Sequence, residues 1–157
     1  MDPKKFDAEP GDLIEIDRWM YQHWAIYIGG EEVVNFAPPN GDIALEHPKG
    51  QVKREKIWEV VGNDKFKINN LLDDKYQPRE RDIIVKDAVR MVGLELPYHL
   101  TFCNCEHFVT YIRYGIPEST QVAEAAKTAD RLLGVGISFL DALNDFFHKD
   151  ANKEERR

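Results

Sequence analysis

The segment CNCEHF at residues 103–108 brings two thiols and an imidazole close together in the chain. Side chains of these types can ligate a metal, pack as buried thiols, or attack a carbonyl as a thiolate. A metal site would use His99, Cys103, Cys105 and His107, but structural zinc sites usually draw on two well-separated pairs of ligands. Cysteines are also often buried as small hydrophobic residues. The position of Cys105 in a predicted helix favours the third kind of chemistry.

Cys105 falls in the first turn of a helix that the sequence predicts. Asn104 is a good N-cap, and the segment CEHFVTYIRYG has apolar residues at helical spacing before a closing Gly115. Because the helix dipole and free N–H groups favour an anion there, we expect the pKa of the Cys105 thiol to be lowered. Cys103 precedes the cap, so we expect the pKa of its thiol to be lowered less. His107 lies about 200° around the helix from Cys105, so we expect it to pack or hydrogen-bond elsewhere.

A base for the thiol must then come from the strands. His23 opens the apolar run HWAIYIGG, and Asn35 interrupts VVNFA in the next predicted strand. A two-residue turn at Gly29-Gly30 puts the two side chains on opposite faces, whereas a three-residue loop that includes Glu31 makes them diagonal neighbours on one face. In the second case Asn35 accepts a hydrogen bond from His23 Nδ1–H and leaves Nε2 for the thiol, as in Cys-His-Asn enzymes.

Periodicity predicts an α+β domain. GDLIEID and the two runs after it alternate as an antiparallel meander, residues 40–50 read as a loop, and QVKREKIWEVVGNDKFKINN mixes strand and short-helix character. RERDIIVKDAVRMVG has helical spacing, with Gly93 as the expected cap. A length of 157 residues with 43% apolar content suits a single core.

The net charge and the cysteine content limit the partners and the cellular location that fit this chain. With 28 acidic against 21 basic residues, the net charge of -7 excludes a nucleic-acid backbone as the main partner. The two cysteines are too close for an ordinary disulfide, and MDPKKFDAEP has no apolar signal core. A cytoplasmic location is therefore expected.

Five motifs resemble a known family. PGDLIEI, YQHWAIYIG, VVNFAPP, VVGNDKFKINN and NCEHFVTYIRYG, from about Pro10 to Gly115, are similar to the phospholipase A/acyltransferases of the H-Ras-like suppressor group, relatives of lecithin:retinol acyltransferase in the NlpC-type superfamily. The resemblance implies a circularly permuted papain-like α+β fold, with a meander sheet packed on helices and the nucleophile at a helix N-terminus. It implies Cys105 as nucleophile, His23 as general base and Asn35 as the third residue, where many members carry histidine.

The resemblance also implies an activity. Such enzymes remove a fatty acyl group from phosphatidylcholine, phosphatidylethanolamine or a related glycerophospholipid through a cysteine acyl-thioester, with neither calcium nor another cofactor, and pass it to water or to a lipid amine or hydroxyl. Tyr21 is a candidate oxyanion donor or a packing aromatic, and Trp19 and Trp24 fit either the core or a lipid interface. Two other classes remain open: a cysteine peptidase, amidase or deubiquitinase-like hydrolase, and a non-catalytic interaction protein.

The C-terminal region departs from the family pattern. We expect an N-terminal extension over residues 1–9, the domain over 10–117, an amphipathic helix over 118–148, and a disordered tail over 149–157. Family members usually end in a long apolar anchor, but the apolar run LLGVGISFL has nine residues and a spanning helix needs about 20. The expected helix has an acidic polar face and would pack on protein or rest peripherally on a membrane.

Overall fold

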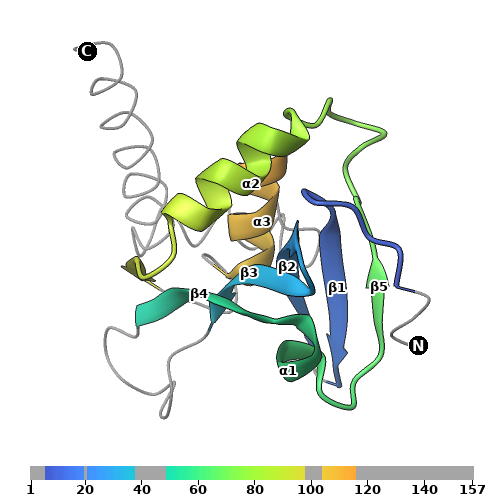
Figure 1. Ribbon diagram of the computed structural model, residues 1–157, viewed down its shortest axis with the longest axis vertical. Coiled ribbons are helices and arrows are strands. Elements are labelled where there is room, and N and C mark those ends of the chain that lie inside the picture. Colours follow the sequence, from blue (N-terminus) through green and yellow to red (C-terminus); the bar gives the residue numbers. More distant parts are fainter. Residues whose placement is uncertain (1–5, 20, 38–48, 98–103, 116–157) are drawn as a thin grey trace, which may run out of the picture.

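The computed structural model describes residues 6–19, 21–37, 49–97 and 104–115 (Figure 1). In chain order its elements are β1 Leu13–Arg18, β2 Tyr21–Gly29, β3 Glu32–Ala37, β4 Lys49–Lys56, α1 Ile57–Val61, β5 Phe66–Ile68, α2 Arg81–Arg90, β6 Glu95–Pro97 and α3 Cys105–Tyr114. The strands of these residues form one sheet in the order β5-β1-β2-β3-β4-β6, and each pair of neighbours is antiparallel. The predicted α+β class is confirmed.

The first three strands form the predicted meander, and β4 continues it. In the β1–β2 hairpin the pairing runs from Leu13↔Ile26 to Arg18↔Tyr21. The mixed segment resolves into β4, α1 and β5, and β5 returns to the outer side of β1. The sequence did not predict β6, which extends the sheet beyond β4. Most of the expected loop over residues 40–50 lies outside the described residues.

Helices bury both faces of the sheet. In Figure 1, α2 and α3 lie together on one side, and α1 lies on the other. Because side chains alternate along a strand, Leu13 of β1 joins the core beneath α2 and α3, whereas Ile14 joins the core around α1. On β2, Trp24 faces the first core and Ala25 the second.

Helix α2 occupies the segment in which helical spacing was predicted. Ile84 and Ala88 are fully buried, as their spacing requires. Gly93 is not the C-cap, a position that Met91 takes instead. Gly93 has a left-handed φ of 93° in the following turn, and its N–H donates to the Val52 carbonyl at 2.8 Å. The glycine therefore ties the turn to β4 after the helix has ended.

A buried arginine fixes the C-terminal half of α3, and sequence reasoning missed it. Arg113 is 2% exposed, donates to both carboxylate oxygens of Asp73 at 3.1 and 2.9 Å, and donates to the Gly11 carbonyl at 2.8 Å. The Tyr114 hydroxyl donates to the same carboxylate at 2.6 Å. Burial raises the pKa of Asp73, but the hydrogen bonds from Arg113 and Tyr114 and the charge of Arg113 together leave it lowered. Arg113 is the one arginine of α3 and follows the apolar residues Val109 and Ile112, and this was the available signal.

Candidate active site

The N-terminus of α3 is capped as predicted. Asn104 has an extended backbone, and its Oδ1 accepts from the N–H groups of Glu106 at 3.0 Å and His107 at 3.2 Å. Gly115, with a left-handed φ of 77°, ends the helix. Cys105 is therefore the first residue of α3 and the first helical residue after the cap.

His107 serves the same cap. Its Nδ1 accepts from the Asn104 N–H at 3.3 Å and completes a capping box, in which glutamate or glutamine usually stands. Burial lowers the pKa of His107 to about 4. We expected His107 to pack or to hydrogen-bond elsewhere than at the thiol. It hydrogen-bonds to the helix cap, so this expectation is confirmed.

His23 and Asn35 come together through the β2–β3 hairpin. The hairpin turns at Gly30–Glu31 and has a register shift just before the turn. Beyond this bulge Ile26 pairs with Val34, so the pairing matches that expected of the longer loop, although the turn itself has two residues. His23 and Asn35 are consequently diagonal neighbours on one face of the sheet.

The hydrogen bond between them uses a different ring nitrogen from the one predicted. His23 Nε2 lies 2.9 Å from Asn35 Oδ1, whereas the prediction used Nδ1. Since the amide oxygen can only accept, Nε2 carries the proton and Nδ1 is the unprotonated nitrogen. Asn35 Nδ2 donates to Glu55 Oε2 at 2.9 Å and to the Lys53 carbonyl at 3.4 Å, which fixes the orientation of the amide. His23 and Asn35 are 3% and 2% exposed.

The Cys105 thiol lies against the strand segment that carries His23. Its Sγ donates to the Gln22 carbonyl at 3.8 Å, and the backbone N–H of Trp24 hydrogen-bonds to it. These two backbone groups flank His23 on β2, and α3 packs on β2 and β3. The thiol thus rests on the β2 backbone on either side of His23, and Asn35 holds the ring of that histidine from β3.

Burial controls the charge of the thiol and the imidazole. It raises the pKa of Cys105 to about 12, an effect opposed by the Trp24 N–H and the N–H groups of the helix start and reinforced by the Glu106 carboxylate. The predicted lowering is therefore wrong, because removal from water outweighs the helix N-terminus. Burial likewise lowers the pKa of His23 to about 4, although the bond to Asn35 opposes it. At neutral pH each group is uncharged.

The three aromatic residues considered for the site or for a lipid interface differ in how deeply they are buried. Trp24 is 3% exposed and belongs to the core beneath α3. Trp19 is 91% exposed in the β1–β2 turn, with a left-handed φ of 53° that is unusual for a large side chain. Tyr21 is half-buried at the start of β2, opposite Arg18, and its role as an oxyanion donor stays a prediction.

Several predicted features lie outside the described residues. These are His99 and Cys103 of the alternative metal site, residues 1–5 of the expected extension over residues 1–9, the expected helix over residues 118–148, and the expected tail over residues 149–157. Among the residues that the structure does describe, no helix combines the length and apolar character needed to cross a bilayer.

The structure is that of an α+β protein with a buried thiol at a helix N-terminus, packed against a strand that carries a histidine. A family profile described as lecithin retinol acyltransferase matches residues 6–118. The chain belongs to the lecithin retinol acyltransferase family.

Named relatives extend the similarity to nearly the whole chain. The chain is 40% identical to phospholipase A and acyltransferase 3 of Mus musculus, and the match covers 96% of each protein. It is 44% identical to phospholipase A and acyltransferase 2 of Homo sapiens over 84% of each, and 40% identical to the human phospholipase A and acyltransferase 4 over 83% of this chain and 85% of that protein. The resemblance recognised in the sequence motifs is confirmed.

Proposed function

We propose that the chain is a phospholipase A and acyltransferase that takes a fatty acyl group from a glycerophospholipid as a thioester on Cys105. Phosphatidylcholine and phosphatidylethanolamine are the proposed donors, and water or a lipid amine or hydroxyl is the acceptor. The observation that carries the proposal is the position of the Cys105 thiol on the backbone either side of His23, whose ring Asn35 holds. The names of the relatives support the same class of reaction.

In the proposed first step His23 Nδ1 takes the thiol proton while Sγ attacks the ester carbonyl. Burial disfavours a lone thiolate and a lone imidazolium, so the two charges form together. The imidazolium then protonates the departing glycerol oxygen as the carbon–oxygen bond breaks and the thioester remains. His23 next activates the acceptor, whose oxygen or nitrogen displaces Sγ.

The oxyanion of the tetrahedral intermediate needs hydrogen-bond donors. Asn104 Oδ1 already accepts from the N–H groups of Glu106 and His107, so we assign the backbone N–H of Cys105 to the oxyanion, with the Tyr21 hydroxyl as the second donor. These steps use only groups of the chain, and we propose no calcium requirement. The order His23, Asn35, Cys105 supports a circularly permuted papain-like arrangement.

Intact-mass measurement tests the proposal. The full chain is incubated with a phosphatidylcholine dispersion in the presence of a calcium chelator, and an increment of one acyl group on the Cys105 peptide is expected. Labelling only by peptide thioester probes would instead indicate a peptidase or amidase of the same fold. No adduct with any acyl donor would indicate a non-catalytic interaction protein and would overturn the proposal.

We propose that Trp19 gives this cytoplasmic enzyme a peripheral contact with the lipid surface. An indole ring is favoured at a membrane interface, and the tip of the β1–β2 hairpin presents this one to solvent. Trp19→Asn keeps a residue that tolerates a left-handed backbone and should lower activity on vesicles about ten-fold, equivalent to about 1.4 kcal/mol. Turnover of a soluble short-chain ester should be unchanged. Val92→Asn, at another exposed apolar residue, is the control, and an equal loss in both variants would contradict the assignment.

Asn35 is expected to matter through the orientation of the His23 ring. Asn35→Ala removes the acceptor at Nε2 and should slow thioester formation about 100-fold, or about 2.7 kcal/mol. Asn35→His restores a hydrogen-bonding group and should remain within a few-fold of the wild type. Single-turnover rates of both variants check this, and an unaffected alanine variant beside an inactive histidine variant would reduce Asn35 to a strand residue.

A further inference from the structure

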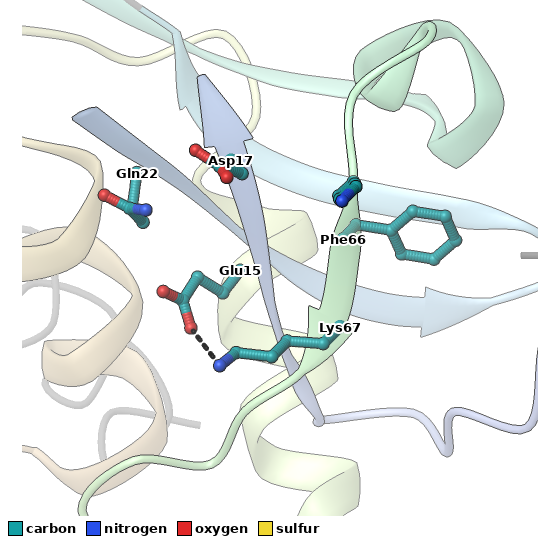
Figure 2. Close-up of a pocket in the computed structure, with 6 residues that line it drawn as sticks. Glu15, Asp17, Gln22, Phe66 and Lys67 are labelled. Atoms are coloured by element: carbon teal, nitrogen blue, oxygen red, sulfur yellow. Dashed lines mark ion pairs between the residues drawn. The ribbon is translucent and has the colours of Figure 1, made fainter. Parts of the chain in front are cut away.

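A shallow pocket of about 190 Å³ lies between β2, β1 and β5. It is lined by Glu15, Asp17, Gln22, Lys65, Phe66 and Lys67. Figure 2 shows that Glu15, Gln22 and the Lys67 ammonium lie to one side of β1, whereas the Phe66 ring points to the other side. Two carboxylates and two ammonium groups therefore line the pocket, together with Gln22 and Phe66.

The charged groups of the pocket are only partly engaged with one another. Lys67 Nζ lies 3.7 Å from Glu15 Oε2, which also accepts from Asn69 at 2.8 Å. Within the part of the chain that the structure describes, the side chains of Asp17 and Lys65 have no hydrogen-bond or ion-pair partner. Both are exposed. One anion and one cation thus remain available to a ligand that carries both charges.

The pocket is connected to the thiol through Gln22. The Gln22 side chain lines the pocket, and its carbonyl accepts the hydrogen bond from Cys105. Asp17 lies directly opposite Gln22 in the β1–β2 pairing, and Glu15 lies opposite Trp24, whose N–H also meets the thiol. Since neighbouring strands are about 4.8 Å apart, β1 lies roughly one strand spacing beyond the β2 backbone on which the thiol rests.

We propose that this pocket binds the phosphoethanolamine headgroup of the acyl donor, an inference that rests on the proposed function. Only a few bonds separate a glycerophospholipid ester from its phosphate, so a carbonyl at Cys105 leaves the headgroup at the distance of β1 and β5. Lys65 and Lys67 receive the phosphate, and Asp17 and Glu15 receive the ammonium. With equal numbers of each charge, the pocket matches a zwitterion better than an anionic headgroup.

The donors and acceptors in the pocket favour a primary ammonium over a quaternary one. A carboxylate accepts hydrogen bonds from a primary ammonium, whereas a choline group has no such hydrogens and is usually held by aromatic faces. The aromatic ring of this pocket, Phe66, packs instead in the core around α1. Phosphatidylethanolamine should therefore be the better donor.

A charge reversal at Asp17 tests the inference. Phosphatidylethanolamine and phosphatidylglycerol with the same acyl chains are mixed equally in neutral detergent micelles, and release of each lysolipid is measured with the full chain. Asp17→Lys should move the preference toward phosphatidylglycerol about ten-fold, and the change should shrink at high salt. Glu95→Lys makes the same change of charge at an exposed residue on β6, at the opposite edge of the sheet, and should move the ratio less than two-fold.

A soluble ester without a headgroup distinguishes failure of the proposed headgroup site from failure of the proposed acyl chemistry. If all three proteins hydrolyse it equally and the lipid ratio changes only in Asp17→Lys, the headgroup site is supported. An unchanged ratio, or an equal change in both lysine variants, would overturn the site while leaving the acyl chemistry intact. Failure of the wild type on the ester and on both lipids would instead reject the proposed function itself.

Discussion

Cys105→Ala is expected to abolish formation of the acyl adduct and to lower phospholipid turnover by about 10³-fold or more, because the proposed thioester forms on the Cys105 sulfur. The thiol is 2% exposed and shares the core beneath α3, so alanine leaves only a small cavity. The variant should therefore melt close to the wild type. Intact mass, lysolipid release and a thermal melt on the same preparation check the prediction.

Cys103→Ala is the matched control, since it removes the other thiol of the chain. It should retain most of the activity and still show the adduct on Cys105. An adduct that survives in Cys105→Ala and disappears in Cys103→Ala would transfer the nucleophile to Cys103. Inactivity of both variants with normal melts would show that the two thiols act together.

Local signals predicted much of this fold. Strand alternation predicted the meander, and Asn104 and Gly115 marked both ends of α3, because such signals depend only on neighbours in the chain. The choice of face for His23 and Asn35 depended on the turn, and a bulge before Gly30 gives a two-residue turn the register expected of a three-residue loop. A register shift of this kind leaves no simple mark in one sequence.

The remaining errors concern interactions between distant parts of the chain. Arg113 is paired with Asp73, a partner that only the folded chain brings near. The pKa of Cys105 was predicted from the helix N-terminus alone, which is visible in the sequence, whereas the burial that dominates comes from the sheet beneath α3. Position on an element was predictable, and the dielectric environment of the side chain was not.

His23→Gln is expected to remove activity while keeping the fold. A glutamine amide can still donate to Asn35 Oδ1, so the buried hydrogen bond survives and only the base is lost. Lysolipid release should fall by about 10³-fold. His107→Gln is the control, because glutamine also completes a capping box and should retain activity within a few-fold. Substantial turnover by His23→Gln, or inactivity of a folded His107→Gln, would contradict the assignment of the base.

The pH dependence of stability shows independently whether these histidines are buried as neutral rings. Burial lowers the pKa of His23 and of His107 from 6.5 to about 4, so the unfolded chain binds protons between these pH values that the folded chain does not. The free energy of unfolding should therefore fall as the pH decreases from about 6.5 to about 4, and each glutamine variant should remove one proton from that dependence.

Activity should stay level from about pH 6 to pH 9, because Nδ1 is already unprotonated and the thiol stays neutral. A decline in activity between pH 8 and 9 would instead indicate a preformed thiolate–imidazolium pair, in which the imidazolium loses its proton there. Urea unfolding and single-turnover rates across this pH range, on the wild type and both variants, distinguish the two descriptions of the site.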